Sequence, residues 1–127
     1  MPSERILVIE NYDLLAQLMV EILTGEPEFE VVGVAQTFAE AKVELLRTPP
    51  DIVIQDLALP DISGFDAIRV TLDMVPSARI ILLIEEAHQC HKAALKLGAR
   101  TSIRKDLIAT DLVPAVREII NCKMSQI

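Results

Sequence analysis

The sequence predicts an α/β fold in which a parallel β-sheet is covered by helices on both faces. Five short apolar runs alternate with five longer segments of helical periodicity, a pattern typical of parallel sheets with crossover helices. Central runs such as ILVI and IILLI are apolar on consecutive residues, as burial on both faces of a sheet requires. Hydrophobic residues make up 51% of the chain, enough for an apolar core on each side of the sheet.

Each element follows from local patterns. The strands are predicted over residues 5–9, 29–35, 51–55, 78–84 and 100–104, and the helices over about 12–25, 37–48, 64–73, 87–97 and 110–122. Gly25 and Gly98 end the first and fourth helices, because glycine commonly follows the last helical turn. Thr37 and Glu40 form a capping box for the second helix, and Ser63 offers a cap for the third.

The last two helices carry apolar stripes that we expect to be core, including Leu95, Val113, Val116 and Ile120. Pro114 is expected in the first turn of the last helix, where a missing N–H is tolerated.

Composition restricts the classes of function. Nineteen acidic residues against twelve basic ones give a formal charge of −7, so we expect no binding of DNA or RNA by this domain. The longest apolar runs are far shorter than a membrane span, and the N-terminus has no signal-peptide pattern. We therefore expect a single soluble, cytoplasmic domain over residues 1–127 that does not enter a membrane.

Residues with hard oxygen atoms or a positive charge lie where the predicted strands end. They are Glu10 and Asn11, Asp56, Glu85, and Lys105. The carboxyl ends of parallel strands meet at one edge of a sheet, so these side chains are expected to converge. A carboxylate pair beside a lysine suits a divalent cation and an anion together.

Three stretches, VIENYDLL, DIVIQDLALPDISG and LGARTSIRKD, resemble the receiver domains of two-component response regulators. The resemblance covers essentially all 127 residues. It implies a flavodoxin-like (βα)5 three-layer sandwich with strand order 2-1-3-4-5.

The resemblance also implies a function without enzymatic activity of its own. Asp56 would accept a phosphoryl group from a histidine kinase or a phosphotransfer protein. Glu10, Asn11 and Asp56 would hold Mg²⁺, and Lys105 would bind a phosphoryl oxygen. Relatives commonly form homodimers through the fourth helix, fifth strand and fifth helix, and the sequence leaves open whether this chain does.

Four positions depart from the pattern that the resemblance implies. Asn11 replaces a second acid, so we expect weak Mg²⁺ binding. Ile84 replaces a hydroxyl residue, and Glu85 replaces a small one and adds negative charge beside an anion site. Ser102 replaces an aromatic residue that normally changes rotamer with that hydroxyl. These departures predict poor coupling between phosphorylation and the face made by the fourth helix, fifth strand and fifth helix.

Several alternatives stay open. Asp56 could be a capping acid, and Lys105 could be its structural partner in a pocket that is never phosphorylated. The whole chain would then be a pseudo-receiver, an interaction module that works without phosphorylation. A flavin-binding protein shares the sheet topology but requires a Ser/Thr/Gly-rich loop after the first strand, where this chain is acidic.

Other polar residues have simpler explanations. The HQCH stretch, with His88 and His91, is interpreted as a solvated helix face in preference to a metal site. Asp61 and Asp66 are expected to solvate a loop or cap a helix.

Overall fold

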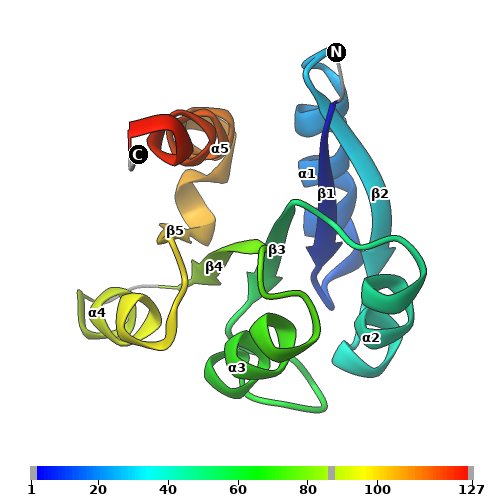
Figure 1. The fold of residues 1–127 in the computed structure, drawn as a ribbon, viewed down its shortest axis with the longest axis vertical. Helices are drawn as coiled ribbons and strands as arrows, with labels where there is room; N and C mark the ends of the chain where they lie inside the picture. The colour runs from blue at the N-terminus through cyan, green and yellow to red at the C-terminus, as the bar shows by residue number, and fades with distance from the viewer. Residues whose placement is uncertain (1–2, 86–87, 126–127) are drawn as a thin grey trace.

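A computed structural model describes residues 3–85 and 88–125 and has the three-layer α/β architecture expected from the sequence (Figure 1). Five parallel strands form one sheet in the order β2-β1-β3-β4-β5, which confirms the predicted order 2-1-3-4-5. The strands are β1 Glu4–Ile9, β2 Phe29–Ala35, β3 Ile52–Asp56, β4 Arg79–Ile84 and β5 Thr101–Arg104. The helices are α1 Asp13–Thr24, α2 Phe38–Arg47, α3 Gly64–Met74, α4 His88–Leu97 and α5 Ile108–Ser125, with a 3₁₀ turn η1 at Lys105–Leu107.

The sheet separates two apolar cores. One core joins the sheet to α1 and α5, and the other joins it to α2, α3 and α4, on the opposite side in Figure 1. Every residue of β3, the central strand, is buried. Because β3 pairs with β1 and with β4, its end is held from both sides.

Local caps behave largely as the sequence predicts. Thr37 Oγ1 accepts a hydrogen bond from the backbone N–H of Glu40 at 3.1 Å. The carboxylate of Glu40 accepts a hydrogen bond from the N–H of Gln36. In a standard capping box it would accept from the N–H of the N-cap residue, which is Thr37. Ser63 caps α3 through the N–H of Phe65. Gly98 ends α4 with a φ of 112°, a conformation that side chains rarely adopt.

Two sequence-based expectations are wrong. Leu95 is 43% exposed, because α4 packs on the sheet through Ala94. Pro114 lies inside α5 and not in its first turn, because η1 runs directly into a helix that already begins at Ile108. Pro114 therefore removes one backbone hydrogen bond from the helix interior.

Among the described residues, no helix combines the length and the apolar character needed to cross a membrane.

Candidate functional site

The end of β3 places Asp56 in a buried position with one carboxylate oxygen already held. Asp56 is 3% exposed, and its backbone pairs with Leu83 of β4. Its Oδ1 accepts a hydrogen bond from the backbone N–H of Ala58 at 3.0 Å. The carboxylate therefore has a fixed orientation within a rigid sheet.

Lys105 reaches the same carboxylate from the turn that follows β5. Its Nζ lies 2.6 Å from Oδ2 of Asp56 and 3.7 Å from Oε1 of Glu10. Burial alone would lower the pKa of Lys105, but the hydrogen bond to Asp56 and the charges of Asp56, Glu10 and Glu85 outweigh burial and raise it. The ammonium is therefore present at neutral pH between two carboxyl groups.

Glu10 is the second buried acid of the site, at 1% exposure. Its Oε2 accepts the backbone N–H of Tyr12 at 3.0 Å. The pKa of Glu10 is raised to about 7, chiefly by burial. The hydrogen bond and the negative charge of Asp56 also raise this pKa, whereas the N–H of Tyr12 and the charge of Lys105 lower it. Glu10 is consequently protonated in part of the molecules at neutral pH.

The site fits a hard divalent cation. Oε1 of Glu10 is buried and has no hydrogen-bond partner, although buried polar atoms are usually satisfied. Its neighbour Asp56 supplies a second carboxylate, and carboxylate oxygens are the donors that Mg²⁺ prefers. Within residues 3–85 and 88–125, no three His, Cys, Asp or Glu side chains are grouped to hold a metal ion. Asn11, the third ligand that the sequence predicts, offers an amide oxygen and not a carboxylate.

Asn11 points its amide nitrogen at a neighbouring loop. Nδ2 donates to the backbone carbonyl of Gln36 at 3.1 Å, and the side chain is exposed. Its role as a metal ligand stays a prediction.

The predicted switch positions have other contacts. Ile84 is 4% exposed and belongs to the core beneath α4. An isoleucine side chain has no hydroxyl group to donate to the pocket. Glu85 is exposed next to it, and its charge contributes to the raised pKa of Lys105. Ser102 Oγ shares a hydrogen bond of 2.6 Å with Nδ1 of His91, which links β5 to α4.

Sequence reasoning missed the bond between His91 and Ser102. The HQCH stretch and the unusual serine were both noticed, but nothing local in the sequence pairs them. The side chain of His88 lies outside the described residues, so the solvated-face interpretation remains a prediction for that residue.

Asp61 was expected to solvate its loop or cap a helix. It caps α2, the helix before its own loop, and not the adjacent α3. Its carboxylate accepts the backbone N–H groups of Phe38 and Ala39.

Comparisons with known proteins identify the family of this chain. The family model described as the response regulator receiver domain matches residues 6–117. The chain is 30% identical over 132 residues to a protein-glutamate methylesterase/protein-glutamine glutaminase of Syntrophus aciditrophicus, covering 94% of this chain and 37% of that protein. It is 28% identical to the chemotaxis protein CheY of Thermotoga maritima, covering 92% of this chain and 98% of CheY.

Solved structures show the same fold. The crystal structure of a CheX-CheY complex with BeF3⁻ and Mg²⁺ from Borrelia burgdorferi matches with a TM-score of 0.85 at 22% identity, over 94% of this chain and 90% of that chain. The chain spans only about a third to a half of several curated relatives, 37% of the methylesterase and 54% of the DNA-binding activator DevR/DosR of Mycobacterium tuberculosis.

Proposed function

The chain belongs to the response regulator receiver domain family, and from this premise we propose that Asp56 accepts a phosphoryl group from a histidine kinase or a phosphotransfer protein. The observation that carries this proposal is the contact of 2.6 Å between the Lys105 ammonium and the buried Asp56. Beside it, Oε1 of Glu10 lies 3.7 Å from the same ammonium and has no hydrogen-bond partner. A nucleophile, a metal-binding oxygen and an anion-binding cation are thereby supported in one pocket.

The transfer forms one bond and breaks another. Oδ1 of Asp56 is held by Ala58, which leaves Oδ2 to attack phosphorus. A new phosphorus–oxygen bond forms while the bond from phosphorus to the donor's histidine nitrogen breaks, and the electron pair stays with the nitrogen. Lys105 moves from Oδ2 to a phosphoryl oxygen and neutralises its charge.

Glu10, Asn11 and Asp56 are the residues that would hold Mg²⁺, which supplies further neutralisation of phosphoryl charge when bound. Before that, Glu10 must lose its proton, because a protonated carboxyl is a poor ligand. With an amide at Asn11, we expect this cation to bind weakly.

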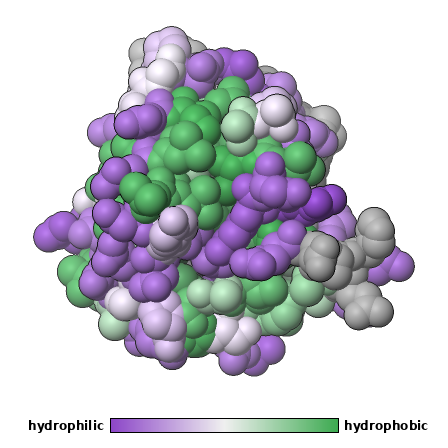
Figure 2. All heavy atoms as spheres, turned by 180° about the vertical axis from the view of Figure 1, so that it is seen from behind, coloured by the Kyte–Doolittle hydropathy of each residue, from purple (hydrophilic) through white to green (hydrophobic). Residues whose placement is uncertain are grey.

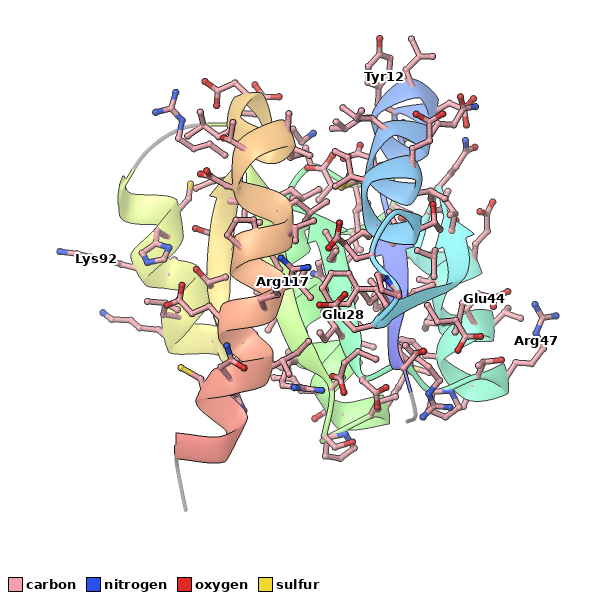
Figure 3. All side chains as sticks on the ribbon, turned by 90° about the horizontal axis from the view of Figure 1, so that it is seen from above. Tyr12, Glu28, Glu44, Arg47, Lys92 and Arg117 are labelled. Atoms are coloured by element: carbon pink, nitrogen blue, oxygen red, sulfur yellow. The ribbon has the colours of Figure 1, made fainter. Side chains whose placement is uncertain are left out.

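Exposed apolar side chains follow closely in sequence after two of the pocket residues and offer a donor protein a surface to contact. Tyr12, at the N-cap of α1, follows Glu10, and Leu107 of η1 follows Lys105. Leu14 and Leu18 of α1 are exposed as well. Figure 2 shows a patch of apolar side chains on the face opposite to the view of Figure 1, and Figure 3 shows Tyr12 projecting from the start of α1. Exposed apolar side chains near a reactive group are typical of a protein interface.

The test uses a small phosphodonor and intact-mass spectrometry. With Mg²⁺ and acetyl phosphate, the protein should gain the mass of one phosphoryl group, and the Asp56→Asn variant should not. No adduct at saturating Mg²⁺, or an adduct that persists in Asp56→Asn, would contradict the proposal.

A second candidate is the pseudo-receiver, which Ile84, Glu85 and Ser102 favour. In this case the Lys105–Asp56 pair is a permanent structural contact. If these residues disable the site, Ile84→Thr combined with Glu85→Ala should increase the adduct formed with acetyl phosphate. An unchanged adduct would remove the support that these positions give to this candidate.

Dimerisation through α4, β5 and α5 stays a prediction. Exposed Leu95 lies on one of these elements, and sedimentation at several protein concentrations tests it.

A further inference from the structure

The first turn of α2 has its free N–H groups satisfied from two different places. Thr37 accepts from Glu40, as a local cap does. The N–H groups of Phe38 and Ala39 instead donate to Oδ1 and Oδ2 of Asp61, at 3.0 and 2.9 Å. These two bonds join residues separated by 23 and 22 positions, so they connect two elements and not neighbours in sequence.

Asp61 lies in the loop that begins at the candidate phosphoacceptor. A bridge between Ala58 and Ser63 closes this loop, and Gly64 N–H donates to the carbonyl of Leu57 at 2.7 Å. Ala58, the first residue of the bridge, is also the residue whose N–H holds Oδ1 of Asp56. Hydrogen bonds therefore hold this closed loop in two places, at the Asp56 carboxylate and at the first turn of α2.

The bonds of Asp61 are charge-assisted. The N–H groups of Phe38 and Ala39 hold the pKa of Asp61 below its usual range, so the carboxylate is ionised at neutral pH. Charge-assisted bonds are about twice as strong as neutral ones, and a negative charge is favourable at a helix N-terminus.

We propose that Asp61 is a positioning residue that couples the state of the Asp56 pocket to α2. This inference rests on the proposed function, since it concerns the same pocket. Ile84 and Ser102 make no such charged contact to a helix terminus, since Ile84 packs in the core and Ser102 bonds to His91. The loop of Asp61 instead joins the pocket to α2 through two charge-assisted bonds. When an anion on Asp56 changes the bond made by Ala58 N–H, the closed loop carries the displacement to Phe38 and Ala39.

Two-dimensional ¹⁵N NMR with Mg²⁺ and BeF3⁻ as the probe tests the coupling. In the wild type, the amide signals of Ala58, Phe38 and Ala39 should all change on addition of the probe. In Asp61→Ala, Ala58 should still change, whereas the probe should no longer change Phe38 and Ala39. Asp61→Asn keeps one acceptor oxygen and should retain part of the response.

Asp66→Ala is the matched control, because it removes an exposed acid from the first turn of α3 without touching α2. It should leave all three responses intact. Thermal unfolding of each variant shows whether it is folded, and Asp61→Asn serves in place of Asp61→Ala if the latter is not.

The outcomes separate the two proposals. No change at Ala58 in the wild type would contradict the proposed function, because the pocket would not take a phosphoryl mimic. A change at Ala58 without a change at Phe38 and Ala39, or an undiminished response in Asp61→Ala, would contradict the coupling alone.

Discussion

The two sides of the Asp56 pocket are built from different kinds of contact. On the side of β3 and α3, the loop is closed by backbone bonds and by Asp61, and Gln55 Nε2 donates to the carbonyl of Gly64 at 3.0 Å. On the side of β4 and β5, Ile84 packs in the core and Ser102 bonds to His91. The first side orients the Asp56 carboxylate, whereas on the second side the bond between Ser102 and His91 holds β5 and α4 together.

Lys105, Glu10 and Asp56 lie close together although Ile84 and Ser102 stand at the predicted switch positions. Holding the Asp56 carboxylate and linking β5 to α4 therefore depend on different side chains. Substitutions on the loop side should alter both stability and chemistry, whereas removal of the Ser102 hydroxyl should alter stability alone.

The largest effect is expected from Gly64→Ala. An added Cβ would lie 2.4 Å from Cα of Leu57 and 2.8 Å from the carbonyl oxygen of Asp56, so the loop must shift. We expect the free energy of unfolding to fall by about 2 to 3 kcal/mol, and the acetyl phosphate adduct to be lost.

Gly25→Ala is the matched control, measured by the same urea unfolding. Its Cβ would meet its nearest atom at 3.4 Å, and Gly25 has a φ of −70° that alanine adopts without strain. Equal destabilisation by the two substitutions would show that the close approach at Gly64 is not what matters.

Lys105→Met should come next in size. It removes the cation from two buried acids, which should lower the free energy of unfolding by about 2 kcal/mol and slow phosphorylation at least tenfold. Stopped-flow or mass-based rates with acetyl phosphate measure the second effect. A Lys105→Arg variant keeps the charge and should be less destabilised, so equal loss in both would argue against a role for charge.

The pH dependence of stability follows from Glu10. Its pKa is about 7 in the folded protein and 4.5 in an unfolded chain, so the folded state binds more protons between these values. This group therefore makes the metal-free protein less stable as pH rises from about 4.5 to 7, and contributes no further change above that. Urea unfolding at several pH values in EDTA measures it.

Mg²⁺ should act in the opposite sense, because it binds the ionised carboxylate. Its stabilising effect should grow as pH rises toward 7 and then level off. Glu10→Gln should abolish both trends, and a wild-type trend that survives in this variant would assign the titration to another group.

The sequence was sufficient to predict the strands of the sheet, because a central strand that is buried on both faces has a continuous run of apolar residues. It was also sufficient to place Asp56 and Lys105 at one edge, since parallel strands end together. It failed where contacts join distant segments: the bonds from Asp61 to Phe38 and Ala39 have no local signal. The prediction that Leu95 belongs to the core was wrong, because helical periodicity shows an apolar stripe but not which part of the stripe faces the sheet.

The smallest effect is expected from Ser102→Ala. The bond between Ser102 and His91 is partly buried, so its loss should cost about 1 kcal/mol. Because Ser102 contacts α4 and not Asp56 or Lys105, the rate of phosphorylation should stay within twofold of the wild type. A double-mutant cycle with His91→Ala isolates the energy of this bond. The losses of unfolding free energy in the two single variants should add up to more than the loss in the double variant. A rate that falls in Ser102→Ala would mean that β5 still communicates with the pocket, and the two sides would then be less independent than their contacts indicate.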